Sequence, residues 1–187
     1  MRIAVTGGIA EGKSTVVRFL GDFGHSTDSS DVFARECFYE PSTQLELATL
    51  LGGAPPVDAA RLRSAISQSD DFRRQVNRVM HPGVVSRILQ SSATFFEVPL
   101  LIETCLHPLF DQVWVVTCGP EEQRARLIQR DGDASAAKIM ASQLTSFVKT
   151  PFADVVIRTN APIETVKRFV QHAGNTLLKN EIARIEG

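Results

Sequence analysis

The feature that most constrains the fold is a short loop near the N-terminus, GGIAEGKS, from Gly7 to Ser14. It fits the pattern G-x-x-x-x-G-K-[ST], in which glycines let successive backbone N–H groups converge on phosphate oxygens. An apolar run, Ile3–Val5, precedes the loop, and Val16 and Leu20 follow it at helical spacing. The sequence therefore predicts a strand, a phosphate-binding loop and a helix, and with them a nucleotide site.

Two polar side chains of this loop have a predicted role in holding the nucleotide. Lys13 is placed to reach the β- and γ-phosphates, and the Ser14 hydroxyl is placed to ligate Mg²⁺. The helix that is predicted to start near Lys13 adds the positive end of its dipole. The alternative, a glycine-rich connection with an exposed lysine, is disfavoured because a strand precedes the loop and a helix follows it.

Further apolar runs are predicted to be strands buried on both faces. They are short and rich in β-branched or aromatic residues, namely ATFFEV at 93–98, QVWVVTC at 112–118 and ADVVI at 153–157. A weaker candidate lies around His25–Asp28. With the N-terminal strand these make five strands separated by helical stretches, an alternation that favours an α/β fold with a parallel sheet flanked by helices.

One helical stretch, residues 40–92, is too long to be a simple connection between two strands. It contains several predicted helices, with N-cap candidates at Asp58 and at Ser69-Asp70. Proline restricts the residue before it, so a helix break is predicted at Pro82. The stretch is interpreted as a helical insertion into the α/β fold.

Two more helical segments follow later in the chain. Residues 119–144 mix charges with few large apolar side chains, and they are predicted to form a surface helical hairpin broken at Asp131-Gly132. A last helix is predicted from Pro162 onward. It is expected to pack on the sheet through one apolar stripe, formed by Ile163, Val166, Val170, Ala173 and Leu177.

Charge and cysteine content bear on partners and compartment. The formal net charge of −1 gives no global attraction to nucleic acid or to membranes, so anion binding has to be local. Cys37, Cys105 and Cys118 have no metal-ligand spacing and are predicted to be buried free thiols, which suits a reducing compartment. No apolar run approaches the roughly 18 residues of a membrane span, so a cytoplasmic protein is predicted.

Two carboxylates are candidates for the chemistry. Asp31 follows the second predicted strand at the expected start of a helix, where it is either a helix N-cap or a general base, and these roles do not exclude each other. Glu97 ends an otherwise buried strand, a costly position unless the carboxylate faces a cation, water or a site. It is either a solvated strand-end residue or a carboxylate that binds Mg²⁺ through water.

Two basic side chains are weaker candidates when taken alone. His81 precedes Pro82, and the plain interpretation is an ordinary histidine at a helix break. Arg130 lies at the tip of the charged hairpin, where a mobile lid often brings an arginine onto the transferred phosphoryl group. Arg124 and Arg126 lie close by, so a solvated charged face is the alternative.

Taken together, these motifs resemble the dephospho-coenzyme A kinase family. The matching stretches, in order, are TGGIAEGKST, SSDVFAR, MHPGVV, EVPLLIE, VWVVTC, QRDGD, IMASQL and KTPFADVVI. The resemblance spans about residues 1 to 175 of the chain. It implies one P-loop kinase-type domain with a core at 1–39, 93–118 and 145–187, a helical acceptor-binding insertion at 40–92 and a helical lid at 119–144.

The resemblance also implies a reaction, namely transfer of the ATP γ-phosphate to the ribose 3′-hydroxyl of dephospho-coenzyme A. Asp31 is expected to act as the base, with Lys13 and Arg130 neutralising the phosphoryl oxygens. Mg²⁺ is expected at Ser14, with Glu97 as a further candidate through water. ATP is expected to contact Gly8, Ile9, Ala10, Glu11, Gly12, Lys13, Ser14 and Thr15. The acceptor is expected to contact Asp31, His81, Pro99, Leu100 and Glu103.

The expected partners are therefore ATP and dephospho-coenzyme A, with no nucleic acid and no membrane, for a monomer or weak homo-oligomer. The chain departs from the family in places. Ala59 stands where an arginine is usual, AISQSDDF replaces a segment with a Val-Phe pair, and RTNAP replaces Asp-Asn-x-Gly after the last strand. Two alternatives stay open: a related kinase for another small hydroxyl acceptor, and a nucleotide-binding paralogue without transfer activity.

Overall fold

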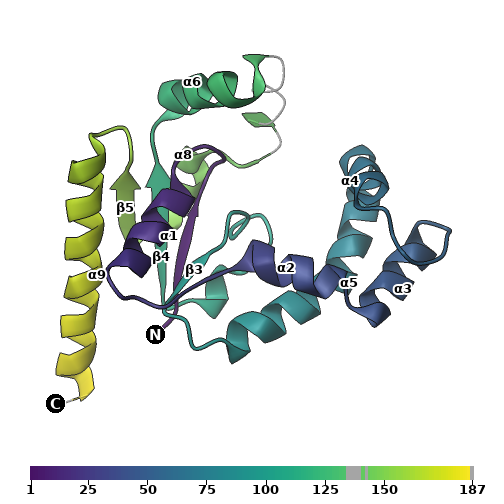
Figure 1. The fold of residues 1–187 in the computed structure, drawn as a ribbon, viewed down its shortest axis with the longest axis horizontal. Coiled ribbons are helices and arrows are strands. Elements are labelled where there is room, and N and C mark those ends of the chain that lie inside the picture. Colours follow the sequence, from purple (N-terminus) through teal and green to yellow (C-terminus); the bar gives the residue numbers. More distant parts are fainter. Residues whose placement is uncertain (134–139, 142, 186–187) are drawn as a thin grey trace. The chain divides into compact units, whose positions relative to one another are not determined.

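The fold is built on a five-stranded parallel β-sheet (Figure 1). The computed structural model describes residues 1–133, 140–141 and 143–185 of the chain. The strands in chain order are β1 (Ile3–Gly7), β2 (Thr27–Ser29), β3 (Phe95–Glu97), β4 (Gln112–Thr117) and β5 (Val155–Arg158). Each overlaps one of the five predicted segments, so the predicted α/β fold with a parallel sheet is confirmed.

Strand β1 is the middle strand of the sheet, whose order is β2-β3-β1-β4-β5. It pairs in parallel with β3, where Ile3 lies opposite Phe95, and with β4, where Ile3 lies opposite Gln112. All five residues of β1 are buried, as expected for a strand that is covered on both faces. The loop that follows β1 therefore starts from the buried middle strand of the sheet.

The chain divides into two compact units. The core unit comprises Met1–Asp28 and Ser92–Gly187, and the helical unit comprises Ser29–Ser91. Described helices of the core unit are α1 (Lys13–Asp22), η1 (His107–Leu109), α6 (Pro120–Asp131), α8 (Ser146–Lys149), η2 (Thr150–Phe152) and α9 (Ile163–Ile185). Those of the helical unit are α2 (Ser30–Phe38), α3 (Pro41–Leu50), α4 (Ala59–Gln68) and α5 (Asp70–Gln90). Residues 134–139 and 142 of the predicted lid lie outside the described residues.

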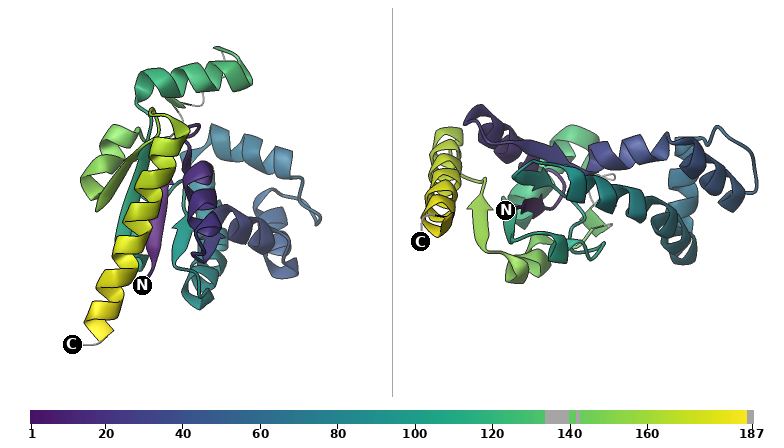
Figure 2. Two further views of the ribbon diagram at one scale, coloured as in Figure 1. Left: turned by 60° about the vertical axis from the view of Figure 1, so that its left-hand side comes forward. Right: turned by 90° about the horizontal axis from the view of Figure 1, so that it is seen from below.

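The apolar core of the core unit joins one face of the sheet to α1 and α9. Strand side chains meet Val16, Phe19 and Leu20 of α1 and Val166 and Val170 of α9. The strand residues of this cluster are Ile3, Val5, Phe95, Trp114, Val116 and Ile157. Helix α8 lies on the opposite face of the sheet (Figure 2). Both faces of the sheet are thus covered by helices.

The apolar stripe predicted for the C-terminal helix α9 is buried or partly buried with one exception. Val166 and Val170 are buried, and Ala173 and Leu177 pack partly buried against the same cluster. Ile163, predicted to be in the stripe, is 53% exposed because it is the first residue of the helix and the buried contact begins one turn later. With its 23 residues α9 is long, yet neither it nor another described helix is apolar enough to cross a membrane.

The cysteine prediction holds for two of three residues. Cys37 and Cys118 are buried free thiols, and burial raises the pKa of each thiol above its usual value. Cys105 is exposed, so its predicted burial is wrong. It occupies a turn with φ of 55° in which the next residue, Leu106, points into the protein instead.

The predicted break at Pro82 is also wrong, because α5 runs through it without interruption. An internal proline costs about 3 kcal/mol or more through the lost hydrogen bond and the ring clash. Packing of the second half of α5 compensates, since Val84 and Ile88 are buried. At Gly83 an added Cβ would lie 2.8 Å from Cys37 Sγ, so the glycine lets α2 approach α5 closely.

The two helix starts predicted in the helical unit are confirmed. The Ala60 backbone N–H donates to Asp58 Oδ1 at 2.8 Å, which makes Asp58 the N-cap of α4. The Phe72 N–H donates to Ser69 Oγ at 3.2 Å, which makes Ser69 the N-cap of α5. Both contacts are local, which is why the sequence alone indicates them.

His25 is a partly buried histidine between the sheet and α9. Its ring meets Phe95 edge-on, with centroids 5.2 Å apart, and a Cβ on Gly174 would lie 2.6 Å from Nε2. The Nε2 atom has no hydrogen-bond partner among the described residues. Burial therefore lowers the pKa of His25 below the ordinary value of 6.5.

A lowered histidine pKa makes stability fall with falling pH. Below about pH 6.5 the unfolded chain binds a proton that the folded chain does not, so the free energy of unfolding decreases from neutral pH down through the lowered pKa of His25. We expect the melting temperature to drop between pH 7.5 and 5.5, and the drop to shrink in His25→Leu. Thermal unfolding across pH checks this, with exposed His172→Leu as control. An equal pH dependence in His25→Leu and the unaltered chain would contradict it.

Candidate active site

The loop between β1 and α1 has the backbone that a phosphate-binding loop needs. Gly12 is the N-cap of α1 and has φ of 92°, and Gly7 has φ of 148°. A Cβ at Gly7 would lie 2.2 Å from the carbonyl oxygen of Val116, so only glycine fits there. Ala10 also has a left-handed φ of 61°, which costs a non-glycine residue about 1–2 kcal/mol. Of the three positive-φ residues in this loop, two are therefore glycines.

Lys13 is held against this loop. It is the first residue of α1, is 8% exposed, and its Nζ donates to the carbonyl oxygen of Gly8 at 2.7 Å. The ammonium group therefore lies over the loop, next to the backbone N–H groups at the start of the helix. This arrangement matches the predicted role of Lys13 toward phosphates.

Ser14 and Glu97 meet in the structure. Ser14 Oγ donates to Glu97 Oε1 at 2.9 Å, and Glu97 ends β3 opposite Val5 of β1. The pair brings a hydroxyl and a carboxylate together beside Lys13, and both are oxygen ligands of the kind that Mg²⁺ prefers. The donor set fits the predicted ion.

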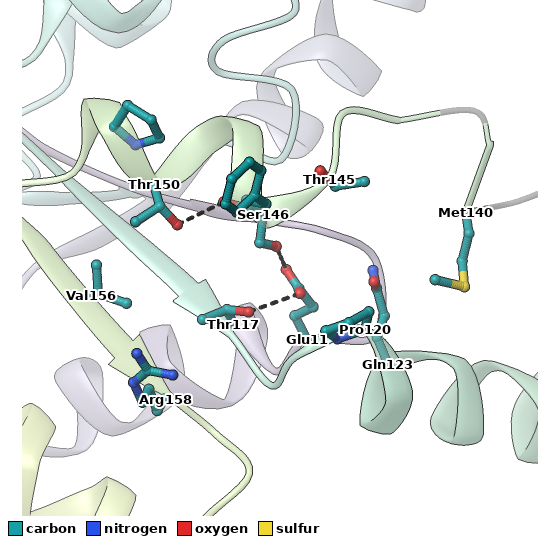
Figure 3. A pocket seen from close by; sticks show the side chains of 12 residues that line it. Glu11, Thr117, Pro120, Gln123, Met140, Thr145, Ser146, Thr150, Val156 and Arg158 are labelled. Atoms are coloured by element: carbon teal, nitrogen blue, oxygen red, sulfur yellow. Dashed lines mark hydrogen bonds between the residues drawn. The ribbon is translucent and has the colours of Figure 1, made fainter.

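Glu11 has a side-chain role that the sequence did not indicate. It is 1% exposed, and its carboxylate accepts hydrogen bonds from the Gly8 N–H, from Ser146 Oγ and, at 3.2 Å, from Thr117 Oγ1 (Figure 3). Three donors satisfy the buried charge, as burial of a carboxylate requires. Glu11 thus bridges the phosphate-binding loop to β4 and to α8.

Thr159, one of the departures from the family pattern, also holds the loop. Its Oγ1 donates to the carbonyl oxygen of Glu11 at 2.6 Å. The guanidinium group of Arg126 donates to the Thr159 carbonyl oxygen at 2.8 Å and to that of Ala10 at 3.4 Å. The segment RTNAP therefore keeps a structural link to the loop despite its altered sequence.

Helix α6 contacts the loop through residues other than the predicted one. Gln123 Nε2 donates to the carbonyl oxygen of Ile9 at 2.9 Å, and Arg126 adds the contacts described above. Arg130 lies near the end of α6, and its guanidinium pairs with the adjacent Asp131 at 2.6 Å. The predicted role of Arg130 toward the transferred phosphoryl group stays a prediction. The sequence indicated Arg126 only as a charged neighbour of Arg130, without a contact to the loop.

The segment after β3 carries three predicted acceptor contacts. The carbonyl oxygen of Pro99 accepts from Thr6 Oγ1 at 3.3 Å, and the Leu100 side chain is 41% exposed. Glu103 Oε1 pairs with Lys149 Nζ at 2.9 Å. Glu103 Oε2 is buried without a hydrogen-bond partner among the described residues, so it remains able to accept a hydrogen bond.

Two predicted residues belong to the helical unit. Asp31 lies in the first turn of α2, where its N–H donates to Ser29 Oγ at 3.3 Å, so Ser29 and not Asp31 is the N-cap. His81 lies on α5, and burial lowers its pKa, which keeps the imidazole neutral at pH 7. It lines a cavity of about 570 Å³ with Arg74, Asn77, Arg78, Pro82 and Val85.

The core unit has a cavity of about 630 Å³ beside the loop (Figure 3). Its lining mixes apolar side chains with hydroxyl, amide and charged groups, as small-molecule sites do. It is lined by Glu11, Thr117, Pro120, Gln123, Met140, Thr145, Ser146, Phe147, Thr150, Pro151, Val156 and Arg158. The buried carboxylate of Glu11 connects this cavity to the phosphate-binding loop.

A parallel sheet whose buried central strand leads through G-x-x-x-x-G-K-S into a helix defines a P-loop nucleotide-binding protein. Residues 1–165 match the family model described as dephospho-CoA kinase. The chain belongs to the dephospho-CoA kinase family.

Curated relatives agree with this assignment, and two solved structures show the same fold. A dephospho-CoA kinase from Gloeobacter violaceus is 36% identical over 186 residues, covering 91% of this chain and 90% of that protein. One from Fusobacterium nucleatum is 30% identical over 190 residues, covering 95% and 98%. The crystal structure of a Thermus thermophilus protein shares the fold, with a TM-score of 0.77, 23% identity and coverage of 100% of this chain and 98% of that one. A solved structure of dephospho-CoA kinase from Campylobacter jejuni shares it too, with a TM-score of 0.72, 22% identity and coverage of 96% of this chain and 98% of that one.

Proposed function

We propose that this chain transfers the γ-phosphoryl group of ATP to the ribose 3′-hydroxyl of dephospho-coenzyme A, in the cytoplasm and as a monomer or weak homo-oligomer. The observation that carries the proposal is the intact phosphate-binding loop, with Lys13 and the Ser14–Glu97 pair, in a chain of the dephospho-CoA kinase family. The parts nearest the phosphates match the reaction, whatever the departures elsewhere.

On the nucleotide side, the backbone from Gly8 to Thr15 would hold the phosphates of ATP. The N–H groups at the start of α1 would face the phosphate oxygens, and the Lys13 ammonium, which lies over the loop, would neutralise charge on the β- and γ-phosphates. Ser14 would ligate Mg²⁺, and Glu97 would bind it through water. When bound, the ion would supply charge neutralisation for the phosphates.

On the acceptor side, Asp31 would accept the proton of the attacking hydroxyl, and the helical insertion at 40–92 would hold the rest of the molecule. Two guanidinium groups, Arg74 and Arg78, line the cavity on α5 beside neutral His81. Arg74 pairs with Asp71 at 2.6 Å, and guanidinium groups at this cavity would suit the diphosphate of dephospho-coenzyme A. In the core unit, Pro99, Leu100 and Glu103 complete the acceptor contacts, and Glu103 Oε2 has a free acceptor position.

Phosphoryl transfer passes through a loose transition state, so positioning and charge neutralisation matter more than covalent chemistry. Lys13 and Arg130 would spread positive charge over the transferred group, while Asp31 orients the hydroxyl in line. Exclusion of water protects the phosphoryl group from hydrolysis. Each role requires a residue type that the chain has at the predicted position.

An ADP-release assay tests the proposed function. Purified protein with ATP and Mg²⁺ is given dephospho-coenzyme A, or one of a panel of nucleosides and sugars, and the position of the new phosphate is determined by NMR. We expect ADP release only with dephospho-coenzyme A, phosphate on the ribose 3′-oxygen, and loss of the rate when Mg²⁺ is omitted. Release of ADP with another acceptor but not with dephospho-coenzyme A would support the alternative of a related kinase. No release with any acceptor would support the inactive paralogue.

A further inference from the structure

Helix α8 has an unusual distribution of side chains. Of its four residues, the polar Ser146 and Lys149 are 7% and 0% exposed, whereas the apolar Phe147 and Val148 are 87% and 44% exposed. A surface helix ordinarily turns its apolar side chains inward. The inverted pattern indicates that the inward face of α8 is used for polar contacts.

The first of these contacts is made by Lys149, whose ammonium group has three N–H donors. They have three acceptors: Glu103 Oε1 at 2.9 Å, the carbonyl oxygen of Pro99 at 2.8 Å and that of Gly7 at 3.5 Å. Gly7 begins the phosphate-binding loop, while Pro99 and Glu103 belong to the segment expected to contact the acceptor. One buried cation therefore joins the nucleotide side of the site to the acceptor side within the core unit.

The second contact is the hydrogen bond from Ser146 Oγ to the Glu11 carboxylate in the middle of the same loop (Figure 3). Ser146 and Lys149 are one helical turn apart, so α8 holds the loop at its first residue and again four residues later. Thr117 Oγ1 supports the same carboxylate from β4. The short helix is thus fixed to the loop at two points.

Stability alone does not account for a fully buried lysine. Removing an ammonium from water costs several kcal/mol, and a well-packed apolar residue in place of a buried ion pair is often neutral or stabilising. What lysine adds at position 149 is a point charge with three donors that fix three acceptors at once. Lys149 therefore fixes the start of the phosphate-binding loop and the 99–103 segment relative to each other.

We propose that Lys149 is a positioning residue for the phosphoryl transfer, acting through Gly7 and through the 99–103 segment. This inference rests on the proposed function. By holding the start of the loop at a fixed separation from the acceptor segment, Lys149 keeps the γ-phosphoryl group and the acceptor aligned. A displacement of about 1 Å between reacting groups can cost about 100-fold in rate. The reaction of ATP with water does not need that alignment.

The test is the ratio of transfer to dephospho-coenzyme A to hydrolysis of ATP without acceptor. In Lys149→Met we expect this ratio to fall by about 10- to 100-fold, with ATP affinity within about threefold of the unaltered chain. Because Lys149→Met leaves Glu103 without its cation and can fold poorly, Lys149→Arg is measured as well. Arginine keeps the charge but cannot present three donors at one point. We expect this variant to fold and its ratio to fall by at least about 10-fold.

Lys167→Met, at a partly buried lysine of α9, is the matched control and is expected to keep the ratio. If Lys149 had only a structural role, its variants would lose transfer and hydrolysis in proportion to the loss of folded protein, which circular dichroism measures. That result would overturn the proposal. An unchanged ratio in folded Lys149→Arg would overturn it too. Failure of the proposed function is a different result, since the unaltered chain would then show no release of ADP that depends on dephospho-coenzyme A.

Discussion

Replacing Lys13 by methionine is expected to weaken ATP binding and to lower kcat by about 10²- to 10³-fold, the usual effect of removing one preorganised charge or donor from a transition state. Lys13 is nearly buried, and its ammonium is held over the loop by the carbonyl oxygen of Gly8. Methionine keeps the apolar stem and removes only the charge. Both ATP affinity and turnover should fall, because the charge acts on bound nucleotide and on the transition state alike.

The measurement is ATP affinity by titration calorimetry together with kcat from the ADP-release assay. Lys167→Met is again the control, because it removes a lysine charge from α9 in the same unit without touching the loop. Melting curves of both variants show whether the fold is kept. Normal ATP affinity in folded Lys13→Met would count against the assignment of this loop to the nucleotide.

The elements that sequence analysis predicted well depend on short stretches of chain. The loop, its strand and its helix follow from contiguous residues, and the caps at Asp58 and Ser69 are contacts with residues two or three positions away. The five strands are short apolar runs that a sheet covered on both faces requires. Such features need no knowledge of the rest of the molecule.

The residues that the sequence did not reveal have partners far along the chain. Ser146 is 135 positions from Glu11, Lys149 is 142 from Gly7, and Arg126 is 116 from Ala10. A signal was present for Glu11, which is a carboxylate inside a phosphate-binding pattern, but its donors could not be inferred without the fold. The uninterrupted helix at Pro82 has the same origin, since packing of α5 on α2 outweighs a local preference.

Replacing Asp31 by asparagine is expected to leave ATP binding largely intact and to lower kcat by about 10²-fold or more, the usual contribution of a general base. Asp31 lies in the first turn of α2, two residues after the end of β2. The N-cap role belongs to Ser29, whose Oγ accepts the hydrogen bond from the Asp31 N–H. A negative charge in the first turn is favoured by the helix dipole, and asparagine keeps the shape while losing the ability to take a proton.

Glu46→Gln is the control, because it neutralises an exposed carboxylate on α3 of the same helical unit. Steady-state kcat, ATP affinity and melting temperature are measured for both variants. A large fall in kcat for Asp31→Asn alone, at unchanged ATP affinity and stability, assigns the carboxylate to the chemical step, since a role in folding would alter stability and a role in nucleotide binding would alter affinity. Unchanged turnover in Asp31→Asn would remove this carboxylate from the reaction, and the base would have to be sought among the other acidic residues of the chain.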